Sequence, residues 1–211
     1  MGSIKIEQIP LEFGHREAYG REDFMLSASN QAAAAWIDRW PDWPAPALIL
    51  YGPPASGKTH LTAVWQERAG LDHDIVEDIE PLIGDLSFEE DLFHHYNMAK
   101  ENGTYLLITA QTAPRTWNFA LPDLASRLKA APCAEIFPPD DMLLSSMLIK
   151  LFQDRQIQVN AELIQYIIPR IERQYDAVRD LVIRIDRQSR SEKRAVTIPL
   201  VSAILNQIEE N

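Results

Sequence analysis

The chain has 211 residues, 46% hydrophobic and 24% charged, so we expect a soluble globular protein of one or two domains. Its formal net charge of −11 argues against a protein whose main function is to bind nucleic acid, because such binding needs a surface rich in lysine and arginine. The single cysteine, Cys133, excludes an internal disulfide and is expected in the core. Apolar runs stay short of the ~18 residues of a membrane span, and we expect a cytoplasmic location.

The first elements are an arm, a helix and a strand. Residues 1–20 are polar and lack helical periodicity, so we expect an extended arm. A helix then runs from Ser29 to Trp40, with Ser29 or Asn30 as its N-cap and one apolar face. Prolines end this helix. They lead into an apolar run at 47–51 that is typical of a buried strand.

A phosphate-binding loop follows this strand, because residues 52–59 have the spacing G-x-x-x-x-G-K-[ST]. Its glycines let backbone N–H groups point at phosphate oxygens, Lys58 can reach the β- and γ-phosphates, and the Thr59 hydroxyl suits Mg²⁺. The next helix adds its positive N-terminal end. The alternative is an ordinary Gly-Pro turn. The residues expected to contact a nucleotide are Gly52, Pro53, Pro54, Ala55, Ser56, Gly57, Lys58, Thr59 and His60.

Two further strands are expected at 73–79 and 105–109, with a helix over 88–101 between them. Strands separated by helices imply parallel crossovers, so the fold class is α/β with a sheet covered on both faces. Glu77 and Asp78 near the end of the first strand are candidates to hold Mg²⁺ or its water; the alternative is a pair of solvated acids. Thr109 is a candidate polar sensor of the γ-phosphate.

Beyond Pro138 and Pro139 the pattern predicts helices alone, because apolar residues recur at helical spacing. These helices are expected at about 140–154, 161–173, 176–189 and 199–208. The predicted domains are an arm over 1–20, an α/β nucleotide-binding domain over 21–137 and a helical domain over 138–211. A basic cluster, for which a solvated helix face is the simplest interpretation, consists of Arg184, Arg187, Arg190, Lys193 and Arg194.

Several short motifs lie along nearly the whole chain. They are GREDF at 20–24, SN at 29–30, the phosphate-binding loop, EDI at 77–79, LLIT at 106–109, LPDLASRL at 121–128 and AVTIPLV at 195–201. Together they resemble the DnaA-like AAA+ proteins, and most closely the Hda (HdaA) family of regulatory inactivators of replication initiation. The resemblance implies an AAA+ P-loop NTPase with a small all-α lid domain, in which Arg127 is the arginine finger and Arg179 the sensor-2 arginine.

Two departures from the family pattern are visible. Lys58 and Glu77 are separated only by residues 59–76, which is too short for the further strand and helix of DnaA-like sheets. We therefore expect a reduced parallel sheet that lacks one strand and the DNA-touching insertion. Glu77 also stands where the family usually has the metal-binding Asp, which predicts weak or no intrinsic hydrolysis.

The arm contains the pattern Q-x-x-L-x-F at Gln8, Leu11 and Phe13. Members of the family carry a short peptide that docks in the hydrophobic pocket of the DNA polymerase III sliding clamp, and these residues match it. A glutamine amide fixes orientation while leucine and phenylalanine fill an apolar pocket. The alternative is an arm that folds onto its own domain as a strand.

The leading hypothesis is a negative regulator of replication initiation at the bacterial nucleoid and replisome. The resemblance implies resident ADP or ATP with Mg²⁺, tethering to the clamp, and presentation of Arg127 to ATP bound on DnaA, without strong direct DNA binding or membrane contact. A DnaC-type helicase loader remains open; there Asp78 would activate water and Arg127 would complete a neighbour's site in a homo-oligomer. Whether the chain itself is a monomer or a homodimer is left open by the sequence. A small-metabolite kinase and a clamp adaptor with a structural nucleotide are further alternatives.

Overall fold

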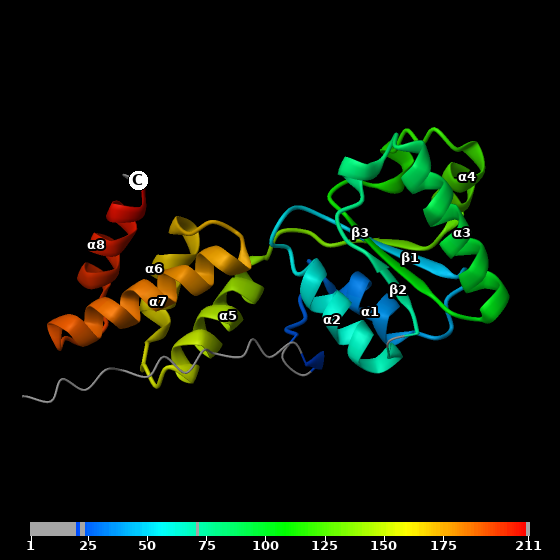
Figure 1. The fold of residues 1–211 in the computed structure, drawn as a ribbon. Helices are drawn as coiled ribbons and strands as arrows, with labels where there is room; N and C mark the ends of the chain where they lie inside the picture. The colour runs from blue at the N-terminus through cyan, green and yellow to red at the C-terminus, as the bar shows by residue number, and fades with distance from the viewer. Residues whose placement is uncertain (1–19, 22–23, 71, 210–211) are drawn as a thin grey trace, which may run out of the picture.

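The computed structural model describes residues 20–21, 24–70 and 72–209. An α/β domain and a helical domain lie side by side, joined by the strand-to-helix segment after residue 135 (Figure 1). Gln8, Leu11 and Phe13 lie outside the described residues. No helix in the described part of the chain is long and apolar enough to cross a membrane.

The α/β domain is built on a four-stranded sheet in the order β2-β3-β1-β4, in which every neighbouring pair is parallel. The strands are β1 (Ala47–Tyr51), β2 (Asp74–Val76), β3 (Leu106–Ala110) and β4 (Cys133–Glu135). The reduced sheet is confirmed, because β2 follows directly on the helix after the phosphate-binding loop. Strand β4 was not predicted, and the expectation that Cys133 lies in the core was wrong, because Cys133 is exposed. On this edge strand only the central residue is buried.

Two pairs of helices cover the sheet, as Figure 1 shows. They are α1 (Gln31–Asp38) and α2 (Lys58–Ala69) on one face, and α3 (Leu86–Asn102) and α4 (Pro122–Ala130) on the other. Successive side chains of β1 point to opposite faces of the sheet and so contribute to both cores. Leu48 packs with Ile37 and Trp65, whereas Ile49 packs on the opposite side. Short 3₁₀ turns, η2 (Glu80–Leu82) and η3 (Pro114–Thr116), follow β2 and β3.

Glu89 on α3 is a buried carboxylate that joins separate segments of this domain. The side chain is 0% exposed and accepts hydrogen bonds from the N–H groups of Gly84 (2.8 Å), Ala120 (3.0 Å) and Leu121 (2.6 Å). A buried charge is costly unless it is hydrogen-bonded in this way. Glu89 therefore fixes the residues just before α4.

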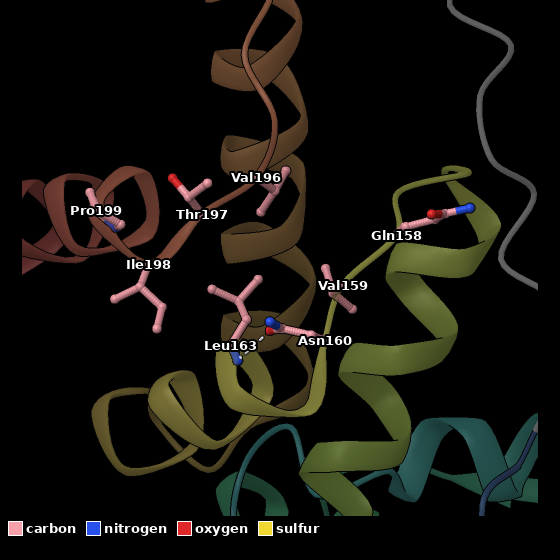
Figure 2. Close-up of a pocket in the computed structure, with 8 residues that line it drawn as sticks. All are labelled: Gln158, Val159, Asn160, Leu163, Val196, Thr197, Ile198 and Pro199. Carbon is pink, nitrogen blue, oxygen red and sulfur yellow. Dashed lines mark hydrogen bonds between the residues drawn. The ribbon is translucent and has the colours of Figure 1, made fainter.

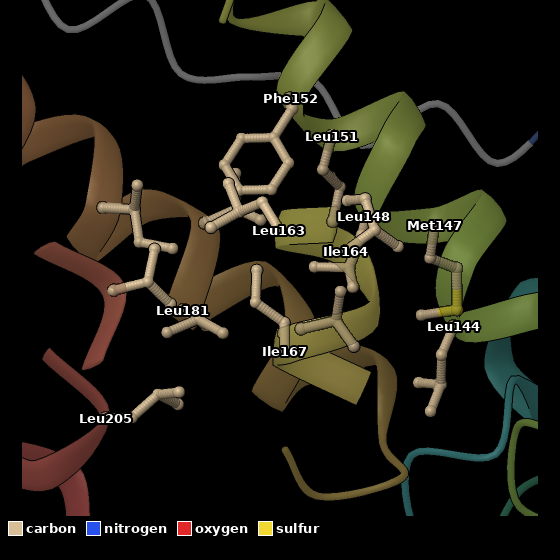
Figure 3. Close-up of a cluster of buried hydrophobic side chains, with 14 of the residues drawn as sticks. Leu144, Met147, Leu148, Leu151, Phe152, Leu163, Ile164, Ile167, Leu181 and Leu205 are labelled. Carbon is tan, nitrogen blue, oxygen red and sulfur yellow. The ribbon is translucent and has the colours of Figure 1, made fainter. Parts of the chain in front are cut away.

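The helical domain consists of α5 (Asp141–Asp154), α6 (Ala161–Ile167), η4 (Ile168–Arg170), α7 (Tyr175–Glu192) and α8 (Ile198–Glu209). Their apolar faces form one core, part of which Figure 3 shows. Asp140 and Asn160 cap α5 and α6 by accepting from the N–H groups of Leu143 and Leu163. The helix predicted over 161–173 ends at Ile167, because Pro169 has no N–H to continue the helical hydrogen bonds.

Candidate nucleotide-binding site

The loop between β1 and α2 is held tightly against the end of β4. A Cβ added at Gly52 would lie 2.1 Å from the Ile136 carbonyl oxygen, so only glycine fits there. Gly57 has φ +101°, which also favours glycine, and α2 begins at the next residue. The loop therefore leads directly into the N-terminus of α2.

We expect Gly52→Ala to destabilise the fold by about 1–3 kcal/mol, because the methyl group would push the loop away from Ile136. The urea midpoint of unfolding measures this loss. Gly103→Ala is the matched control, since that position also has positive φ, +68°, but open space around the added methyl group. A loss no larger than that of the control would show that the close approach at Gly52 is unimportant.

Lys58 folds back over the loop. Its ammonium group donates hydrogen bonds to the carbonyl oxygens of Gly52 (2.8 Å) and Pro53 (2.9 Å), and the residue is only 7% exposed. Burial lowers the pKa of Lys58, and the carboxylates of Asp78 and Glu80 oppose that effect. A buried cation held by carbonyl oxygens alone is well suited to exchange them for phosphate oxygens.

The neighbouring loop residues differ in exposure. Thr59 is exposed at the start of α2. His60 is partly buried, with its ring edge-on to Phe24 at 5.1 Å and its Nε2 atom 3.4 Å from the Gly20 carbonyl oxygen. The segment before α1 thus closes one side of the loop.

Thr109 connects the end of β3 to the acidic segment after β2. Its buried hydroxyl accepts a hydrogen bond from the Asp78 N–H at 3.0 Å, and its carbonyl accepts from Ile79 at 3.1 Å. Asp78 has φ +47°, a conformation unusual for a non-glycine residue. Glu77 and Asp78 are both exposed, and the described residues contain no cluster of three or more His, Cys, Asp and Glu side chains suited to a metal.

Glu80 belongs to the same region but was missed by sequence reasoning. Its Oε1 atom accepts from the N–H groups of Gln111 (2.6 Å) and Thr112 (2.7 Å), and from the Thr112 hydroxyl (3.0 Å). Its Oε2 atom is buried and has no hydrogen-bond partner among the described residues. The only available signal was its position two residues after Asp78, beyond the end of the predicted strand.

A cavity of about 410 Å³ separates the phosphate-binding loop from the helical domain. The loop side consists of Pro53, Pro54 and Ser56, and Pro138 with residues 172–174 forms the rest. The Ser56 hydroxyl is buried and has no hydrogen-bond partner among the described residues. This free hydroxyl, the Gly57 backbone and the Lys58 ammonium fit a phosphate chain, whereas the Gly52 N–H already donates to the Ala110 carbonyl oxygen (3.1 Å).

Arg173 lines this cavity and links it to the connection between the domains. Its guanidinium donates to the Pro139 carbonyl oxygen (3.0 Å) and to Asp141 Oδ1 (2.6 Å). No sequence motif distinguished it from the other arginines. It holds residues 172–174 beside the start of α5.

The two arginines singled out by sequence lie elsewhere. Arg179 is on α7, with guanidinium atoms 4.0 Å from the carboxylates of Asp176 and Asp180, and is not among the residues lining the cavity. Arg127 is on α4, where its guanidinium lies over the rings of Phe93 (4.7 Å) and Tyr96 (5.4 Å) of α3. The structure therefore brings together the loop, Asp78 and Thr109, while Arg127 packs against a separate helix.

Comparisons with known proteins agree on the fold. Residues 142–205 match the family described as "Hda, lid domain". Domain III of the replication initiation protein DnaA from Thermotoga maritima is similar over 90% of this chain and 96% of its own, with a TM-score of 0.75 and 18% identity.

Two further solved structures extend the comparison. AMPPCP-bound DnaA from Aquifex aeolicus has a TM-score of 0.70 and 16% identity over 83% of this chain and 69% of its own. A RuvB variant from Thermotoga maritima has a TM-score of 0.64 and 13% identity over 89% of this chain and 71% of its own. The chain therefore has the fold of DnaA domain III, and its helical domain matches the Hda lid domain.

Proposed function

We propose that the chain is an Hda-like regulator of replication initiation, which binds ADP or ATP and stimulates hydrolysis of ATP carried by DnaA. The observation that carries this proposal is the match of residues 142–205 to the Hda lid domain, on a chain that also has a complete phosphate-binding loop. The likeness of the fold to DnaA domain III over 90% of this chain also supports it.

In this proposal the nucleotide lies between the loop and the helical domain. Residues 52–60 would hold its phosphates. Thr109 would contact the phosphates from the sheet, and Arg179 would contact them from the helical domain. The Mg²⁺ ligands would be Thr59, Glu77 and Asp78. The metal would neutralise phosphate charge. The buried Ser56 hydroxyl and the Lys58 ammonium support the phosphate position, and Arg173 would keep the lid segment beside it. Binding would thus set the orientation of the two domains.

Arg127 would act on a nucleotide bound by another protein. Its guanidinium packs on α3 and is partly exposed, so it is well placed to be presented to a partner. An arginine supplied in trans stabilises the charge that develops on a transferring phosphoryl group. Asp78 would serve the chain's own hydrolysis, which we expect to be weak.

The arm would tether the regulator to the sliding clamp through Gln8, Leu11 and Phe13. Tethering converts a weak encounter into one at high effective concentration, which can raise apparent affinity by 10²–10⁴. The net charge of −11 supports contact with DNA through the clamp rather than directly.

The deciding experiment measures hydrolysis of ATP pre-bound to DnaA, with this protein, ADP and DNA-loaded clamp present. We expect the triple substitution Gln8→Ala, Leu11→Ala and Phe13→Ala to require about 100-fold more protein for the same stimulation, because only the tether is lost. Raising the protein concentration should restore the rate. The matched control is Ile4→Ala with Ile6→Ala, which removes apolar arm residues outside the motif.

The other outcomes separate the alternatives. Clamp binding without any acceleration, even at high protein concentration, would contradict the regulator and indicate a clamp adaptor with a structural nucleotide. A fast, DNA-stimulated ATPase activity of the chain alone would indicate a helicase loader.

A further inference from the structure

A hollow of about 530 Å³ lies in the helical domain, between the α5–α6 connection and the α7–α8 connection (Figure 2). None of the described residues that line it is charged, and the Asn160 side chain among them already accepts a hydrogen bond from the Leu163 N–H (2.9 Å). An unused charged group lies instead in the α/β domain. It is Glu80, whose buried Oε2 atom has no hydrogen-bond partner in the part of the chain that the structure describes.

The other carboxylate oxygen of Glu80 holds the segment that follows β3. Its Oε1 atom accepts from the Gln111 N–H (2.6 Å), the Thr112 N–H (2.7 Å) and the Thr112 hydroxyl (3.0 Å). One residue before this segment begins on β3, the Thr109 hydroxyl accepts from the Asp78 N–H. The chain after β2 is therefore joined to the chain after β3 by side-chain hydrogen bonds at successive positions, so that a displacement of one carries the other with it.

The connection continues from Thr112 to α4. The Thr112 hydroxyl that donates to Glu80 also accepts a hydrogen bond from the Trp117 indole N–H (3.1 Å). Trp117 is 3% exposed and belongs to the same hydrophobic cluster as Leu128, the residue after Arg127 on α4. Two hydrogen bonds and one packed indole thus lead from Glu80 to the helix that bears Arg127.

The segment that carries Glu80 is strained and lies within the electrostatic reach of the phosphate-binding loop. Asp78 has φ +47°, and backbone strain of this kind is concentrated at sites that change conformation. Burial lowers the pKa of Lys58, and the carboxylates of Asp78 and Glu80 oppose that effect. Phosphate binding at the Lys58 ammonium would therefore change the electrostatic environment of the Glu80 carboxylate.

We propose that Glu80 is a positioning residue that transmits nucleotide binding at the loop to Trp117 and α4. When phosphates bind at Lys58, the Glu80 carboxylate shifts, and residues 111 and 112 shift with it. The Trp117 indole then adjusts its packing against α4, which places Arg127 for its partner. This inference rests on the proposed function, because its last step uses Arg127.

Glu89 limits how far this movement extends. Its carboxylate accepts from the N–H groups of Ala120 and Leu121, so the start of α4 stays in place. The adjustment is therefore confined to residues 111–119, and it reaches Arg127 through the side chains packed on α4 rather than through a movement of the whole helix.

The first test follows the Trp117 indole N–H in ¹H–¹⁵N NMR spectra of the full chain, with Trp117→Phe to assign the resonance. We expect saturating ADP with Mg²⁺ to shift it, because the indole donates to Thr112. Glu80→Ala should reduce this shift at least about fivefold, whereas Glu80→Gln, which keeps an oxygen acceptor, should retain most of it. Glu90→Ala, which removes an exposed acid from α3, is the matched control and should leave the shift unchanged.

A second variant interrupts the connection one step further on. Thr112→Val removes the hydroxyl between Glu80 and Trp117 but keeps both backbone donors to Glu80. It should abolish the ADP-dependent shift while amide hydrogen exchange at residues 111 and 112 stays as slow as in the parent chain. Glu80→Ala should instead speed exchange at these two amides at least about tenfold and leave Ile108 in β3 unchanged, which shows that the sheet is intact.

The last step is tested with ATP pre-bound to DnaA, in the presence of clamp and saturating ADP. Glu80→Ala should lower the stimulation of hydrolysis about tenfold although Arg127 is present, and Glu80→Gln should stay close to the parent rate.

The outcomes separate this proposal from the proposed function. A Trp117 resonance that ignores bound ADP, a response equally large in Glu80→Ala, or parent-level stimulation by Glu80→Ala would overturn the coupling through Glu80. A parent chain that shows the Glu80-dependent response but does not stimulate DnaA would contradict the proposed function and leave the coupling to Trp117 standing. A parent chain that binds no ADP would overturn both.

Discussion

Replacing Lys58 with alanine is expected to raise the dissociation constant for ADP by about 10–100-fold. The structure places its ammonium group inside the loop, where it is nearly buried and bound by two carbonyl oxygens. A hydrogen bond to a charged group contributes about 1.5–3 kcal/mol, which corresponds to that change in affinity. Isothermal titration calorimetry with ADP and Mg²⁺ measures it directly.

A control separates lost binding from lost folding. Lys129→Ala removes an exposed lysine from α4 and should leave ADP affinity unchanged. Without nucleotide, Lys58→Ala should unfold within a few degrees of the parent chain, because one of the two carbonyl oxygens it leaves belongs to Pro53, which lines the cavity. An alanine variant that binds ADP as tightly as the parent would refute the phosphate-binding role of the loop.

The second large effect is expected at Arg127. Arg127→Ala should reduce the clamp-dependent stimulation of DnaA-bound ATP hydrolysis by about 10³-fold or more, the usual scale for an arginine supplied in trans. Binding of ADP and of clamp should stay at parent levels. Arg127→Lys should recover little of the rate, because lysine lacks the planar fork of donors.

The packing of Arg127 requires a further control, because its guanidinium lies over Phe93 and Tyr96. A structural role would be worth about 0.5–2 kcal/mol and would appear as lower stability. Phe93→Ala removes one of these rings and keeps the arginine. Normal stimulation by Arg127→Ala, or an equally complete loss in Phe93→Ala with its fold intact, would rule out the proposed finger.

Much of the fold could be predicted from local pattern. Strand β1 is buried except at its last residue and β3 is buried throughout, both strands are mostly apolar, and the lid helices carry regular apolar faces, so local pattern identifies them. Strand β4 is three residues long with one buried side chain, which leaves no periodicity to detect. The same edge position exposes Cys133, whose residue type favours burial.

The candidate site could be predicted where one contiguous segment builds it, as the phosphate-binding loop does. Glu80 was missed because its partners lie 31 and 32 residues further along the chain, at Gln111 and Thr112. Arg173 was missed for the same reason, since Pro139 precedes it by 34 residues. Contacts of this kind depend on how the sheet and the lid fold together, and no local pattern encodes them.

The buried carboxylate of Glu89 has a consequence for how a partner must approach. Three backbone groups converge on it, two of them immediately before the helix that bears Arg127. An outward movement of α4 would remove hydrogen-bond donors from the buried Glu89 carboxylate, which is energetically costly. The position of α4 is therefore restrained. In the proposed function Arg127 would therefore act from a rigid helix, and most of the conformational adjustment needed for a productive complex would fall to the partner, whose ordering would cost the larger share of the entropy.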